Sequence, residues 1–136
     1  MPRLVLAFGC MMLMVGCASS EGEECVAIPS ACAPLYEPTF ENIYSQTFAS
    51  KCSVGNTACH STSAAKGDLV LEGMDAAYES LMAAGYERVN VDEPGCGVLA
   101  QRIESDDSGY VMPLGAKLSD AERCSIHLWV RDGAKR

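Results

Sequence analysis

The sequence predicts a small all-α domain with long loops, stapled by disulfides and preceded by an export signal. Three observations predict this fold class. An amphipathic helical stripe begins at Phe40, and a helix-capping pattern begins at Ser119. An apolar segment lies at the N-terminus, and six cysteines, an even number, follow Cys17. The chain contains no internal repeat and no low-complexity segment.

Residues 1–16 are predicted to be a signal peptide. Arg3 is the only charged residue before Glu21, and residues 4–15 form an apolar run that is too short to span a bilayer. The run ends in Met14-Val15-Gly16-Cys17, which resembles a bacterial lipobox. The resemblance implies cleavage before Cys17 and attachment of lipid to that cysteine. The alternative is an ordinary signal peptide that is cleaved near residues 18–20.

The residue after the lipobox indicates the location of the protein, and the net charge restricts its partners. Ala18 rather than aspartate follows Cys17, which among lipoproteins favours the outer membrane. We therefore expect a lipid-anchored protein of the cell envelope that faces the periplasm or the cell surface. The mature chain has the length of one domain. The full sequence has 18 acidic and 10 basic residues and a net charge of −8, which argues against a nucleic-acid partner.

The cysteines predict disulfides. Cys10 leaves with the signal peptide and Cys17 takes the lipid, so six cysteines remain: Cys25, Cys32, Cys52, Cys59, Cys96 and Cys124. An even number in an exported domain indicates disulfides, and the sequence alone does not choose among the fifteen possible pairings. Proximity favours a small Cys25–Cys32 loop, and a Cys96–Cys124 bridge would brace the turn between them. Cys52 and Cys59 are then left over.

Residues 17–38 are predicted to be a lipidated tether and a cysteine-stapled arm, and residues 39–136 a helical domain. The domain begins with a helix in which Phe40, Ile43, Tyr44, Thr47 and Phe48 share one face. Its N-cap is Thr39, and Pro38 prevents an earlier start.

Two shorter helices are expected in the middle of the domain, after a loop over residues 52–68. The first covers residues 75–84, with Asp75 as its cap, and ends at Gly85. Its buried side is predicted to hold Met74, Ala77, Tyr78, Leu81 and Met82. The second covers residues 98–103, and residues 104–109 form an acidic loop after it.

The last helix has the strongest start signal in the chain. Ser119 and Glu122 have the spacing of a capping box, and Gly133 is placed to stop the helix. Trp129, the only tryptophan, is expected to anchor the core. His127 lies in this helix without a nearby ligand partner, and we interpret it as structural.

Two motifs carry a resemblance to a known family. They are Cys52-Ser-Val-Gly-Asn-Thr-Ala-Cys59-His60 and Tyr110-Val-Met112-Pro113-Leu-Gly115. With the predicted helix order, residues 39–134 resemble the cytochrome c-like domains of bacterial lipoproteins. The resemblance implies haem c bound through thioethers at Cys52 and Cys59, with His60 and Met112 as the iron ligands.

The same resemblance implies what the protein does. Ligation by histidine and methionine leaves no open coordination site, so it suits electron transfer to or from a redox partner protein. We therefore expect no enzymatic activity, because a peroxidase needs the site that Met112 would fill. The walls of the haem site would be apolar residues: Leu69, Leu71, Leu81, Trp129 and Val130.

The spacing of the first motif departs from the family pattern. Six residues separate Cys52 from Cys59, where the usual attachment motif has two. Both cysteines could bind haem, they could bind each other, or Cys59 alone could hold haem. A zinc site is a fourth idea, but no second ligand pair has zinc-finger spacing. If Cys52 and Cys59 form a disulfide, the alternative function is that of a haemless structural or protein-interaction lipoprotein.

Overall fold

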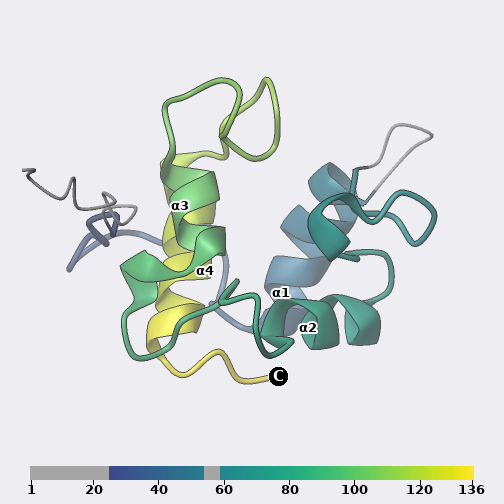
Figure 1. Cartoon of the computed structure of the whole chain (residues 1–136). Coiled ribbons are helices and arrows are strands. Elements are labelled where there is room, and N and C mark those ends of the chain that lie inside the picture. Colours follow the sequence, from purple (N-terminus) through teal and green to yellow (C-terminus); the bar gives the residue numbers. More distant parts are fainter. Residues whose placement is uncertain (1–24, 54–58) are drawn as a thin grey trace, which may run out of the picture.

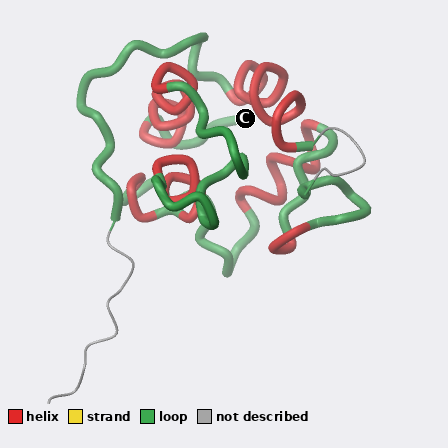
Figure 2. Tube along the Cα trace, turned by 90° about the horizontal axis from the view of Figure 1, so that it is seen from above, coloured by secondary structure: helices red, strands yellow, loops and turns green. Residues whose placement is uncertain are grey.

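The computed structural model describes residues 25–53 and 59–136, and in this part of the chain every regular element is a helix (Figures 1 and 2). The predicted all-α fold class is therefore confirmed. In chain order the elements are α1 (Phe40–Ile43), the π-helix η1 (Tyr44–Cys52), the 3₁₀-helix η2 (Lys66–Asp68), α2 (Met74–Met82), the 3₁₀-helix η3 (Pro94–Cys96), α3 (Val98–Glu104) and α4 (Asp120–Arg131).

The helices form two groups. Figure 1 shows α3 beside α4 in one group, and α1, η1 and α2 in the other. The groups meet where α1 packs against α4, since the rings of Phe40 and Trp129 lie 5.3 Å apart. Across residues 25–53 and 59–136, we find no helix with the length and apolar character needed to cross a membrane.

The first predicted helix is present, but it has two parts. Thr39 caps α1, because its hydroxyl accepts a hydrogen bond from the Asn42 amide at 3.3 Å. The chain then continues without a break as η1, where the Ser53 amide reaches back to the Phe48 carbonyl, five residues earlier. The predicted face is confirmed. Four of its members are buried, and Tyr44 packs against the same core.

The last helix agrees with its prediction at both ends. Ser119 and Glu122 form both hydrogen bonds of the capping box. Gly133, with φ of +97°, follows the end of α4 at Arg131. Trp129 is 2% exposed and donates its indole N–H to the Lys135 carbonyl at 2.7 Å, so it anchors the core and the C-terminal segment together.

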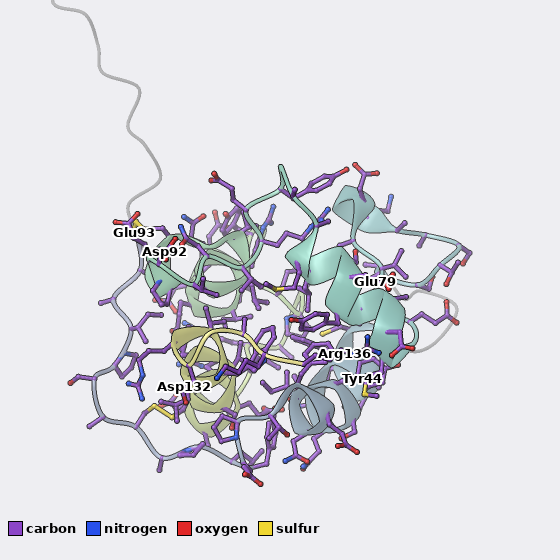
Figure 3. All side chains as sticks on the ribbon, turned by 90° about the horizontal axis from the view of Figure 1, so that it is seen from below. Tyr44, Glu79, Asp92, Glu93, Asp132 and Arg136 are labelled. Carbon is purple, nitrogen blue, oxygen red and sulfur yellow. A yellow bond between two sulfur atoms is a disulfide. The ribbon has the colours of Figure 1, made fainter. Side chains whose placement is uncertain are left out.

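That C-terminal segment ties α4 to α2. The hydroxyl of Tyr78 on α2 donates to the Ala134 carbonyl at 3.0 Å, and Arg136 pairs with Asp75. In Figure 3, Arg136 lies over α2, the helix that also carries Glu79. The contacts hold α2 to the core at the end of the molecule opposite the loop that follows α3.

The prediction for α2 was wrong in its details. Its N-cap is Gly73, and Asp75 lies in the first turn without capping the helix. Met74 and Met82 are 38% and 37% exposed, so only part of the predicted face is buried. Met74 and Met82 are the first and last residues of the helix.

The predicted disulfide pairing is also wrong. The bridges are Cys25–Cys96 and Cys32–Cys124, between residues 71 and 92 positions apart. The arm does not close on itself, because it runs across the α4 group. Its Val26 amide donates to the Gly95 carbonyl, and its Leu35 amide to the Ala121 carbonyl, each at 3.0 Å. Sequence proximity therefore gave the wrong partners.

Candidate functional site

A cavity of about 580 Å³ lies between the two helix groups. One wall comes from η1, the segment around residues 59–71 and α2, and the other from α3 and the loop that precedes α4. The volume falls within the range of small-molecule and cofactor sites, roughly 300–1,000 Å³. The lining is mainly apolar and includes Leu69, Leu71, Leu81, Leu99, Ile103 and Leu118.

All four residues that the sequence proposed as haem contacts line this cavity. Cys52 ends η1, Cys59 and His60 open the next described segment, and Met112 comes from the loop between α3 and α4. The cavity thus gathers residues up to sixty positions apart in the chain. Three of the five predicted wall residues, Leu69, Leu71 and Leu81, line it as well. Trp129 and Val130 do not; they are buried in the core around Phe40.

Backbone hydrogen bonds hold the Cys59-His60 turn in place. The Lys66 amide donates to the Cys59 carbonyl, and the Leu71 amide to the His60 carbonyl, each at 2.7 Å. Glu72 supports the turn from outside, since its carboxylate accepts a hydrogen bond from the Thr62 amide at 2.8 Å. The hydrogen bond between Leu71 and His60 therefore holds the apolar segment Leu69–Leu71 beside His60.

The imidazole of His60 has a buried ring nitrogen without a partner. Nδ1 makes no hydrogen bond with any described residue, although the carbonyls of Leu69 and Lys66 lie near enough to favour a protonated ring. Burial outweighs them and lowers the pKa of His60, and the charges of Arg102 and Arg88 lower it further. His60 is thus held as the neutral imidazole, the form that can act as a ligand.

Cys52 carries a free thiol at the edge of the core. Burial raises the pKa of this thiol to about 11, although the charge of Lys51 acts in the opposite direction. The group is thus a neutral thiol at physiological pH. Cys59 is half-buried on the same cavity. Residues 54–58 between them are outside the described part of the chain.

Met112 is fixed by the backbone of α3. Its amide donates to the Arg102 carbonyl at 2.9 Å, and the Arg102 guanidinium donates to the Tyr110 carbonyl at 3.1 Å. Its neighbour Val111 is buried, whereas Met112 itself is half-buried at the cavity wall. The loop before α4 therefore places Met112 at the wall of the cavity that His60 also lines.

Sequence reasoning missed the basic residues of the site. Lys51, Lys66, Arg88 and Arg102 all line the cavity. They lie in different segments and belong to no motif, so only the folded chain brings them together. No motif or periodicity in the sequence marked these four residues.

The remaining predicted residues lie away from the cavity. Cys25, Cys32, Cys96 and Cys124 are in the two disulfides, and the predicted lipidation site Cys17 falls outside the described residues. His127 is buried on α4 and lies 2.7 Å from the Glu104 carboxylate through Nε2. Within residues 25–53 and 59–136, no three or more His, Cys, Asp or Glu side chains gather as a metal-binding group.

Comparison of the chain with protein-family models, with curated proteins and with solved structures finds no match.

Proposed function

We propose that the protein is a lipid-anchored, c-type cytochrome-like electron carrier of the cell envelope, with haem in the cavity between the two helix groups. The observation that carries this proposal is the gathering of Cys52, Cys59, His60 and Met112 around one apolar cavity of about 580 Å³. Haem iron, when bound, supplies one-electron redox chemistry; the chain supplies its ligands and its surroundings.

The donor residues fit such a group. His60 offers a neutral imidazole with a buried nitrogen that no described residue satisfies. A buried polar atom left in this way costs about 1–3 kcal/mol, which a bound ligand would recover. Met112 offers a thioether, which is uncharged and needs no deprotonation. Together they would provide one nitrogen and one sulfur ligand, as the resemblance implies.

The two thiols fit covalent attachment. Each would add across a vinyl group, with the sulfur bonding to one carbon and the thiol hydrogen passing to the other, so that no oxidant is consumed. Because burial raises the pKa of the Cys52 thiol to about 11, Cys52 is poorly activated as a nucleophile. We expect Cys59 to be the primary attachment site and Cys52 the slower one.

The apolar lining would exclude water from the reacting centre. Leu69, Leu71 and Leu81 approach from one helix group, and Leu99, Ile103 and Leu118 approach from the other. A low local polarity with both iron ligands supplied by the chain favours electron transfer over oxygen chemistry. The predicted lipid on Cys17 would hold the domain at the membrane, within reach of a redox partner.

The test is an absorption spectrum and an intact mass, measured on protein from a host that attaches haem c. We expect a Soret band that shifts on reduction and a mass that is one haem greater than that of the chain. His60→Ala and Met112→Ala should each alter the reduced spectrum. Met82→Ala, which removes an exposed methionine on α2, is the matched control and should not. Protein that carries no haem despite intact maturation factors would refute the proposal.

The second candidate is a haemless, disulfide-stabilised interaction module with the same fold. The six-residue spacing between Cys52 and Cys59 favours it, because attachment of haem at two cysteines normally uses a tighter turn. Peptide mapping decides between the two candidates. Haem on the peptide that contains Cys59 supports the carrier, and a Cys52–Cys59 disulfide supports the module.

A further inference from the structure

The charges around the cavity differ in sign from those of the chain as a whole. Acidic residues outnumber basic ones by 18 to 10 in the sequence. Among the described residues that line the cavity, however, four are basic and none is acidic: Lys51, Lys66, Arg88 and Arg102. The fold has therefore concentrated positive charge at an apolar site.

Three of these cations have no carboxylate partner. Lys51 pairs with Glu122, but none of the ion pairs among described residues includes Lys66, Arg88 or Arg102. Arg88 is only 6% exposed. Arginine is rarely buried to this extent without a counter-charge, because desolvation of the guanidinium is expensive.

Both arginines are held rigidly in the cavity wall. Arg88 donates to the carbonyls of Ser80 and Gly67, at 2.8 and 2.9 Å, and stacks 3.7 Å from the Tyr86 ring. Arg102 stacks 3.8 Å from the Tyr110 ring. Each guanidinium has five N–H donors, so these bonds leave several unused. Both arginines line the same cavity.

We propose that Arg88 and Arg102 form an anion subsite in this cavity, and that the ligand is an apolar molecule that carries a carboxylate. The inference rests on the proposed function for the place of the ligand, but it needs neither iron nor the two cysteines. The carboxylate has two possible sources. In a porphyrin it is a propionate side chain, and in a fatty acid it is the head group.

The test uses the mature chain without haem and two pairs of probes. The first pair is metal-free protoporphyrin IX and its dimethyl ester, which keeps the apolar ring but loses both charges. The second pair is palmitic acid and methyl palmitate. We expect the acid of at least one pair to bind at least about 10-fold more tightly than its ester, because hydrogen bonds from a guanidinium to a carboxylate are charge-assisted and stronger than those to an ester.

Variants assign the effect to the arginines. Arg102→Gln should reduce affinity for the acid about 10-fold and leave affinity for the ester unchanged, and Arg102→Lys should recover part of the loss. Arg131→Gln removes an exposed charge on α4 outside the cavity and is the matched control. Since Arg88 also holds Ser80 and Gly67 in place, Arg88→Lys is the safer variant at that position.

The outcomes separate the two proposals. Porphyrin selectivity that depends on Arg102 supports both the anion subsite and the haem cavity. Palmitate selectivity alone supports the subsite and counts against haem. Three results would overturn the anion subsite. The acid and the ester could bind equally well in both pairs, Arg102→Gln could reduce the affinity for acid and ester by the same factor, or no probe could bind. A protein that takes up haem but shows no acid-over-ester selectivity retains the proposed function and loses this inference.

Discussion

The α4 side of the molecule and the cavity side contain the same kinds of residue in opposite surroundings. His127 on α4 is 2% exposed and lies 2.7 Å from the Glu104 carboxylate, to which Arg123 also donates at 2.9 Å. Among the described residues, the buried Nδ1 of His60 on the cavity side has no hydrogen-bond partner, and Arg88 has no carboxylate partner. One histidine completes a network, and the other is available to a ligand.

The cysteines divide in the same way. Cys32–Cys124 and Cys25–Cys96 fasten the N-terminal arm to α4 and η3, whereas Cys52 keeps its thiol at the cavity. The paired groups therefore hold this small fold together. The unpaired groups cost stability, and a bound ligand would offset that cost.

The largest expected effect comes from the disulfides. Replacing Cys32 and Cys124 by alanine should lower the free energy of unfolding by about 2–5 kcal/mol, because the bridge restricts a long segment of the unfolded chain. Cys52→Ala, which removes a partly buried thiol without breaking a bond, should cost about 1 kcal/mol or less. Urea denaturation measures both. Similar losses in the two variants would contradict the division of the cysteines.

The next effect comes from Glu122, a buried carboxylate on the α4 side. It accepts hydrogen bonds from Lys51, Thr47 and Ser119. Glu122→Ala should cost about 2–3 kcal/mol, because these donors lose their acceptor. Glu79→Ala, at an exposed position on α2, is the matched control and should change stability by less than about 0.5 kcal/mol. Equal effects would show that the network contributes nothing.

Glu122 should also make the free energy of unfolding depend on pH in the acidic range. Burial alone would raise the pKa of Glu122, but the hydrogen bonds from Lys51 and Ser119 outweigh it, and the pKa lies below its ordinary value of 4.5. Its contribution is therefore complete above pH 4.5 and is lost as the pH falls through the folded-state pKa. Stability curves against pH for the wild type and Glu122→Gln should converge below pH 4.5.

The two histidines allow the most direct comparison of the two sides. His127→Ala should lower stability by about 2 kcal/mol, since it opens a space in the core and removes a partner of Glu104. His60→Ala should cost less than about 1 kcal/mol in the ligand-free protein, but should alter the expected spectrum of the reduced haem. A reversal of the two stability effects, measured by thermal denaturation, would refute the assignment of roles.

The smallest expected effect is the titration of His60. Because its pKa is lowered by burial and by Arg102 and Arg88, the unfolded chain binds its proton more readily than the folded one. Stability should thus decline as the pH falls below 6.5, until the folded-state pKa is reached. Above pH 6.5 the stability difference between the wild type and His60→Ala should no longer change with pH in the ligand-free protein. NMR titration of the His60 ring checks the direction of the shift.

Local sequence patterns were enough to predict most of the helices. The capping box at Ser119, the Thr39 cap and the Phe40–Phe48 face depend on residues within a few positions of one another, and all three are confirmed. The prediction failed at α2, where burial of Met74 and Met82 depended on neighbouring segments, and the periodicity of the sequence does not specify those neighbours. The π-type winding of η1 also has no counterpart in the apolar pattern.

The sequence by itself determined which residues could serve as ligands, because Cys59-His60 and Met112-Pro113 are local motifs with recognisable chemistry. Only the tertiary structure decided that these motifs share one cavity with Arg88 and Arg102. It also decided that the N-terminal arm crosses α4, so that the disulfide partners differ from those expected. The physical reason is the distance along the chain over which the interactions act. Caps and helical faces follow from neighbouring residues, whereas pairing, burial and charge at a site depend on segments that meet only when the chain packs.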